Sequence, residues 1–207
     1  AFAGAASVAM AMLLVRLWKG GPVAQAAAGL AMIAAPAYMR MGVLLSQPSF
    51  EPLFWTCIVL LFSTSLKEKT YPRWIFLGIL VALAYLNKST VSLWVFGLFF
   101  GLLFTADRRV LLSRFPWIAG VTAGVILLPH FFWQFQNNWP TVEFVSHLKE
   151  DVFAGIPRIL ILLGHILYEN PFAVPLWVAG LFYLLRRGDA TMRASGCAFL
   201  FVAAALF

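Results

Sequence analysis

The stretch WIFLGILVALAYLNKSTVSLWVFGLFFGLLFT, which runs from Trp74 to Thr105, decides the fold class. It is apolar almost throughout. In lipid the backbone must satisfy its own hydrogen bonds, so a continuous apolar run indicates a helix. One helix of this length would extend roughly 48 Å, whereas the hydrocarbon core of a bilayer is about 30 Å thick. The polar tetrapeptide at 87–90 is therefore predicted to be a tight turn at a membrane face, between two helices.

The composition of the whole chain agrees with this interpretation. Of 207 residues, 62% are hydrophobic and 11% are charged, and the mean hydropathy is +0.89. Soluble domains devote roughly a quarter of their residues to charged side chains, and a soluble fold of this size could not bury so much apolar surface. A transmembrane barrel would alternate apolar and polar residues over segments of about ten. The sequence thus predicts an all-α, polytopic transmembrane helical bundle that forms one domain over 1–207.

Apolar runs mark about eight expected spans, at 2–15, 22–39, 52–66, 74–86, 89–105, 116–133, 156–185 and 194–207. The run at 156–185 contains Asn170-Pro171, and proline both lacks an N–H donor and disfavours helical geometry in the preceding residue. We therefore expect one broken, tilted helix there, or a re-entrant piece followed by a span. The chain begins without methionine and stops inside an apolar run, so it is expected to be truncated at both ends.

Positive charge predicts the orientation of these spans. Eleven of the 15 basic residues fall in four segments, which are 16–19, 67–73, 108–114 and 186–193. The other four are Arg40, Lys88, Lys149 and Arg158. Because cytoplasmic loops carry the excess of Lys and Arg, the loops 40–51, 87–90 and 134–155 are expected on the extracytoplasmic side. Nucleic acid is not an expected partner, since the basic residues are not clustered with stacking aromatics.

Charged residues close to apolar spans are costly, which makes each of them a candidate functional residue. Glu51 stands at the outer start of a span, where it either serves a site or interacts with the positive end of the helix dipole. Lys88 lies in the predicted turn and could bind a phosphate as a point charge or extend to lipid headgroups. Arg40 presents the same two alternatives. His165 and Glu169 are four residues apart and could pair on one helix face.

The third outer loop and the end of the span before it contain residue types that bind sugars. These residues are His130, Trp133, Gln134, Asn138, Trp139 and Glu143. Aromatic rings stack on sugar faces, and amides and carboxylates bond to hydroxyl groups. The same aromatics are also typical of the belt at a membrane interface. Glu51, Glu143 and Asp151 could supply oxygen ligands to a divalent metal, but no spacing requires one, and no cofactor is firmly expected.

Four stretches, taken in order, resemble a known family. They are QPSFEPLFW at 47–55, LNKST at 86–90, LPHFFWQ at 128–134 with NWPTVEF at 138–144, and NP at 170–171 with PLWVAGL at 175–181. Together they resemble bacterial glycosyltransferase family 39. Its members are GT-C membrane enzymes related to protein O-mannosyltransferases and to the aminoarabinose transferase of lipid A.

The resemblance implies a transferase in the bacterial inner membrane. It would move a sugar from a polyprenyl-phosphate donor to a lipid, glycan or protein acceptor at the extracytoplasmic face. Lys88, with Arg40, would stabilise the donor phosphate, and Glu51 would act as a catalytic carboxylate, although aspartate is usual in the family at this position. The side chains of Glu51 and Lys88 are expected to approach one outward-facing cavity, across a donor phosphate rather than in contact.

Two other functional classes compete with the transferase. One is a transporter or lipid flippase, and the other is a non-catalytic membrane subunit. Transporters often contain inverted repeats and charged binding residues near the bilayer midplane. Here the polar residues gather at one predicted face and no repeat is visible, which favours the transferase. The resemblance implies that the principal catalytic acid lies in an outer loop after the first span. No such loop is found in this sequence, and it is expected to precede Ala1. The chain by itself is therefore expected to be inactive.

Overall fold

The computed structural model describes residues 2–43, 46–147 and 155–206. Within these ranges the chain forms helices and no strand, so the predicted all-α class is confirmed. In chain order the helices are α1 (Phe2–Leu17), α2 (Pro22–Ile33), α3 (Pro36–Val43), α4 (Gln47–Lys67), α5 (Tyr71–Asn87), α6 (Val91–Leu103), the 3-10 helix η1 (Ala106–Leu112), α7 (Arg114–Gln136), α8 (Pro140–His147), α9 (Arg158–Glu169), the 3-10 helix η3 (Pro171–Ala173), α10 (Val174–Arg187) and α11 (Ala190–Leu206).

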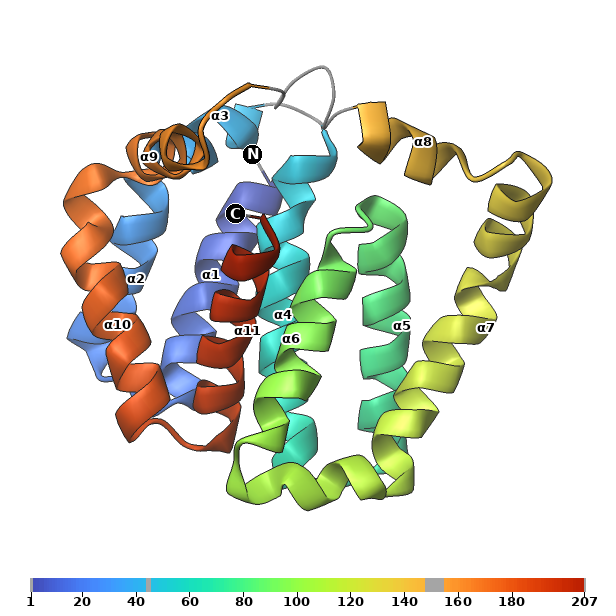
Figure 1. Cartoon of the computed structure of the whole chain (residues 1–207). Coiled ribbons are helices and arrows are strands. Elements are labelled where there is room, and N and C mark those ends of the chain that lie inside the picture. The colour runs from blue at the N-terminus through green and yellow to red at the C-terminus, as the bar shows by residue number, and fades with distance from the viewer. Residues whose placement is uncertain (1, 44–45, 148–154, 207) are drawn as a thin grey trace.

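The longer helices run along a common axis, and shorter ones lie across its ends (Figure 1). The axial helices are α1, α2, α4, α5, α6, α7, α10 and α11, while α3, α8 and α9 lie at the upper end and η1 crosses the lower end. With 21 and 23 residues, α4 and α7 are long and apolar enough to cross a bilayer, judged by length and composition. Helices α1, α2, α5, α6 and α11 are apolar but shorter, and the number of spans stays a prediction.

The structure separates the loops into the two sets that the charge pattern predicts. The α1–α2 and α4–α5 connections, η1 and the α10–α11 connection lie at the lower end (Figure 1). The four segments with most of the basic residues lie in these connections and in the adjoining helix ends. The α5–α6 turn and helices α3, α8 and α9 lie at the upper end. The division of the loops into two ends is therefore confirmed, while the side of the membrane that each end faces stays a prediction.

Two of the predicted runs are interrupted, one of them unexpectedly. The run at 22–39 is not one helix, because α2 ends at Ile33 and α3 begins at Pro36, a residue that cannot donate to the preceding turn. The run at 156–185 breaks at Asn170, as predicted, and resumes through η3 into α10. Because α9 lies across the upper end and α10 is axial, this segment is a short transverse helix followed by one axial helix (Figure 1).

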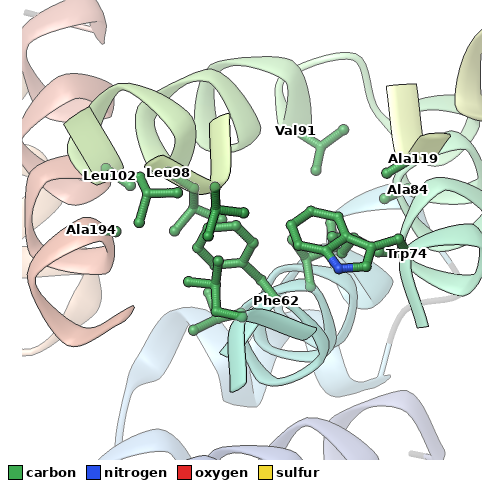
Figure 2. Close-up of a cluster of buried hydrophobic side chains, with 14 residues drawn as sticks. Phe62, Trp74, Ala84, Val91, Leu98, Leu102, Ala119 and Ala194 are labelled. Atoms are coloured by element: carbon green, nitrogen blue, oxygen red, sulfur yellow. The ribbon is translucent and has the colours of Figure 1, made fainter. Parts of the chain in front are cut away.

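The core lies among α4, α5, α6 and α11. Phe62 of α4 and Trp74 of α5 are almost completely buried, and their rings meet edge to face with centroids 6.4 Å apart. Figure 2 shows Phe62 toward Leu98 and Leu102, and Trp74 belongs to the same buried cluster. Large rings thus fill the centre of the bundle and hold α4 against its neighbours.

Helices α6 and α11 are distant in sequence but pack closely, because small residues line their contact. Gly97 and Gly101 lie one turn apart on α6 and face Ala198 and Ala194 of α11. A Cβ atom added at Gly97 would lie 2.8 Å from the Cα of Ala198, and one added at Gly101 would lie 2.9 Å from the Cα of Ala194. In lipid, helices associate through such close packing, and small residues at four-residue spacing permit it.

Candidate functional site

The start of α4 and the turn between α5 and α6 meet at the upper end of the bundle. The side-chain amide of Asn87 donates to the backbone carbonyl of Gln47 at 3.0 Å, which fastens the turn to the first residue of α4. The turn is tight, as predicted, and the backbone N–H of Val91 donates to the carbonyl of Lys88 at 3.2 Å. These bonds bring three side chains of α4 and the turn into contact.

Glu51 and Lys88 form a direct ion pair, and Thr90 completes the cluster. The Nζ atom of Lys88 lies 2.8 Å from Oε2 of Glu51, and the hydroxyl of Thr90 donates to Oε1 of the same carboxylate at 2.6 Å. The side chain of Glu51 is 18% exposed and that of Lys88 is 37% exposed. Two donors of one turn thus hold both oxygens of the carboxylate, and the side chains of Glu51 and Lys88 are in direct contact. An approach of the two side chains across a donor phosphate stays a prediction.

In this cluster the ammonium group of Lys88 is held in place by Glu51. An ammonium group has three donors, and Glu51 accepts from only one of them here. The other two donors of Lys88 can bond to an anion that approaches from the exposed side of its side chain. An ionised carboxylate only accepts hydrogen bonds, so Glu51 repels that anion while it keeps the ammonium in place.

Arg40 is at the same end of the bundle but is not joined to this cluster. It is exposed on α3, a helix that packs against α1, α2, α4 and α9. Within the described ranges it forms no ion pair. A contribution of Arg40 to phosphate binding therefore stays a prediction.

Two of the predicted sugar-binding residues have structural contacts. Gln134 is 3% exposed, and its amide nitrogen donates to the hydroxyl of Thr141 while its amide oxygen accepts from the Thr141 backbone N–H at 3.3 Å. Gln134 thus fastens α7 to α8. The ring of His130 packs edge to face against Tyr85, with centroids 5.8 Å apart, and its Nε2 lies 3.4 Å from the amide nitrogen of Gln134.

The other four predicted sugar-binding residues, Trp133, Asn138, Trp139 and Glu143, are exposed. Asn138 and Trp139 form the link between α7 and α8, and both have positive φ angles, of 59° and 58°. Glu143 pairs with His147 at 3.8 Å. In the described part of the chain no hydrogen bond or ion pair joins these four to Glu51 or Lys88. Their role in sugar binding stays a prediction.

The residues that could hold a metal are not gathered in the described ranges. There, no group of three or more His, Cys, Asp and Glu side chains is close enough to bind an ion. Glu51 and Glu143 lie on separate helices, α4 and α8, and Asp151 lies outside the described residues. His165 and Glu169 lie on α9, but their side chains are also outside what the structure describes.

Sequence reasoning missed Thr90 as a partner of Glu51. The signal was present, because Thr90 is two residues from Lys88 in the polar turn, and a carboxylate bound to one of them is within reach of the other. The sequence could not show that the start of α4 lies beside this turn. Positions 51 and 90 are 39 residues apart, and only the packing of α4 against α5 brings them together.

Comparison with known proteins gives a match to one family model. The family model described as dolichyl-phosphate-mannose-protein mannosyltransferase matches residues 1–133, which is more than half of the chain. The match covers α1 to α6 and most of α7, and thus all three residues of the cluster; it stops just before Gln134. Searches of curated proteins and of solved structures each gave no match.

Proposed function

Because the chain belongs to the dolichyl-phosphate-mannose-protein mannosyltransferase family, we propose that it moves a sugar from a polyprenyl-phosphate donor to an acceptor at the extracytoplasmic membrane face. Family membership already establishes a membrane glycosyltransferase of the GT-C type. The donor, the side of the membrane, the bacterial inner membrane as location, and a lipid, glycan or protein as acceptor belong to the proposal. The family match favours this class over a transporter or flippase.

One observation carries the proposal, namely the ion pair of Lys88 with Glu51 at the upper end of α4. A donor lipid has its phosphate at the membrane surface and its chain in the bilayer. The upper end is the end with fewer basic residues, so by the positive-inside rule it faces the extracytoplasmic side. The partly exposed ammonium of Lys88 at this end of the bundle is suited to a phosphodiester anion.

The proposed reaction is a displacement at the anomeric carbon of the donor sugar. A bond forms between the acceptor oxygen and this carbon while the bond from the carbon to the phosphate oxygen breaks, and polyprenyl phosphate leaves with the electron pair. Negative charge grows on the phosphate, where Lys88 stabilises it. The acceptor proton passes to a base. Glu51 accepts one hydrogen bond at each oxygen, from Lys88 and from Thr90, so we assign it to holding Lys88. A direct part of Glu51 in catalysis stays a prediction.

Transfer of labelled sugar from a polyprenyl-phosphate donor tests the proposal in membranes that contain the full-length protein. Lys88→Ala should raise the KM for the donor, because loss of a charged hydrogen bond, worth about 1.5–3 kcal/mol, corresponds to roughly 10–100-fold in affinity. Lys88→Arg should retain part of the affinity, because the charge survives and the geometry changes. The control is Lys69→Ala, which removes an exposed lysine at the lower end.

Two outcomes would count against the proposal. An unchanged donor KM in Lys88→Ala, at matched expression, would leave Lys88 as an interfacial lysine. Movement of the lipid-linked sugar across proteoliposomes without transfer to any acceptor would instead support a flippase.

A separate prediction concerns the carboxylate. Glu51→Gln should mainly lower turnover, because Lys88 loses the contact that positions it against the leaving phosphate, and Glu51→Asp should restore much of the turnover because the charge is kept.

A further inference from the structure

The side chain of Thr90 does not cap the helix that begins after it. Thr90 is the N-cap residue of α6, where a threonine side chain ordinarily accepts a hydrogen bond from a backbone N–H of the first turn. Here the side chain forms no such cap bond. Its hydroxyl donates instead to Oε1 of Glu51 at 2.6 Å. The hydroxyl of Thr90 is therefore committed to the carboxylate and not to the helix.

We propose that Thr90 is a positioning residue of the donor-phosphate site, and this rests on the proposed function of Lys88. By holding Oε1, the hydroxyl orients the Glu51 carboxylate so that Oε2 alone meets the ammonium of Lys88. Two donors of the ammonium then stay directed away from Glu51, toward the anion. Thr90 determines how strongly Lys88 binds a phosphate without touching the phosphate itself.

Loss of the Thr90 hydroxyl should lower the affinity of Lys88 for a phosphate. The carboxylate of Glu51 is largely enclosed, so an oxygen that loses its donor turns toward the nearest remaining one, which is Lys88. The ammonium is then held by both carboxylate oxygens and is more fully neutralised. A phosphate must compete with that arrangement, and its affinity falls.

Binding of a short polyprenyl phosphate without sugar, to the purified full-length protein, is the direct test. Thr90→Val keeps the shape and removes the hydroxyl, and its Kd for the lipid phosphate should rise roughly tenfold, the effect of one hydrogen bond to a charged group. Thr90→Ser restores the hydroxyl and should restore the Kd. The matched control is Ser92→Ala, which removes a hydrogen bond from the same turn, to the Ser89 carbonyl at 2.7 Å, that does not involve Glu51.

A double-mutant cycle separates positioning from general damage to the turn. In a Glu51→Gln background, Thr90→Val should have little further effect on the Kd, because its action passes through the carboxylate. Equal effects of Thr90→Val in both backgrounds, or no rescue by Thr90→Ser, would overturn the inference. Should Thr90→Val fail to reach the membrane, Thr90→Ala gives the same comparison.

The inference and the proposed function fail in different ways. If Lys88→Ala binds the lipid phosphate as the wild type does, the proposed role of Lys88 is wrong and Thr90 has no such site to position. If Lys88→Ala loses affinity while Thr90→Val behaves like Ser92→Ala, only the role of Thr90 is wrong.

Discussion

Substitution of Gly101 by alanine should force α6 and α11 apart. The added Cβ would lie 2.7 Å from both the backbone oxygen of Ala194 and the Cβ of Cys197, and 2.9 Å from the Cα of Ala194. Ordinary contacts of a Cβ atom begin at 3.4 Å. Two of the three neighbours belong to the backbone, so a side-chain rotation cannot relieve the clash and α11 must move as a body.

The magnitude follows from two opposing terms. Overpacking of a closely packed contact costs typically 1–3 kcal/mol. Replacement of glycine by alanine inside a helix returns at most about 1 kcal/mol of helix propensity. We therefore expect Gly101→Ala to lower the free energy of unfolding by up to about 2 kcal/mol. At this chain length that shift lowers Tm by up to roughly 8 °C.

The control is Gly124→Ala on α7, since a Cβ added there meets no described atom within 4 Å other than its chain neighbours and the nearby backbone of its own helix. Gly124→Ala gains helix propensity without a clash, so its free energy of unfolding should equal or exceed that of the wild type. Thermal unfolding of the purified protein in one detergent, followed by tryptophan fluorescence, gives both values. Equal Tm values for Gly101→Ala and Gly124→Ala would refute the close α6–α11 contact.

Three further predictions concern the two ends of the bundle. Lys19 has a φ of 64° just after α1, where glycine is the usual residue, so Lys19→Gly should raise Tm by a few degrees through relief of about 1 kcal/mol of strain, and an unchanged or lower Tm would contradict this. An impermeant thiol reagent applied to intact cells should label Asn138→Cys and not Ser113→Cys, and the reverse pattern would invert the predicted orientation. Gln134→Leu removes both side-chain bonds to Thr141, so limited proteolysis should cut the α7–α8 link faster than in the wild type; unchanged protection would show that α8 is held by other contacts.

Much of the fold was determined by local properties of the sequence. Apolar runs predict helices because a backbone in lipid must satisfy its own hydrogen bonds. The turn at 87–90 followed from a length limit, and the interruption at Asn170 followed from the chemistry of proline. The same reasoning could have found the break before Pro36, but the apolar run on both sides concealed it. The grouping of loops at two ends was readable because basic residues follow a positional rule.

Part of the candidate site was also predictable. Glu51 and Lys88 stand out because charges beside apolar spans need a reason to be there. A sequence-based reading placed them at one end of the bundle, as the structure does. It could not distinguish a contact across a phosphate from a direct ion pair, because that depends on a few ångströms between two helices.

Only the tertiary structure decided which helices touch and which polar atoms pair. The contact of Gly101 with Ala194 joins residues far apart in the chain, and nothing in either helix alone specifies its partner. Glutamine is a residue type that binds sugars, yet the side-chain amide of Gln134 bonds to Thr141 of the same chain. Thr90 occupies a position typical of a helix cap, yet it bonds to Glu51. A side chain's residue type limits what it can bind, but its partner depends on the packing of distant segments, and this is why sequence alone could not assign these three roles.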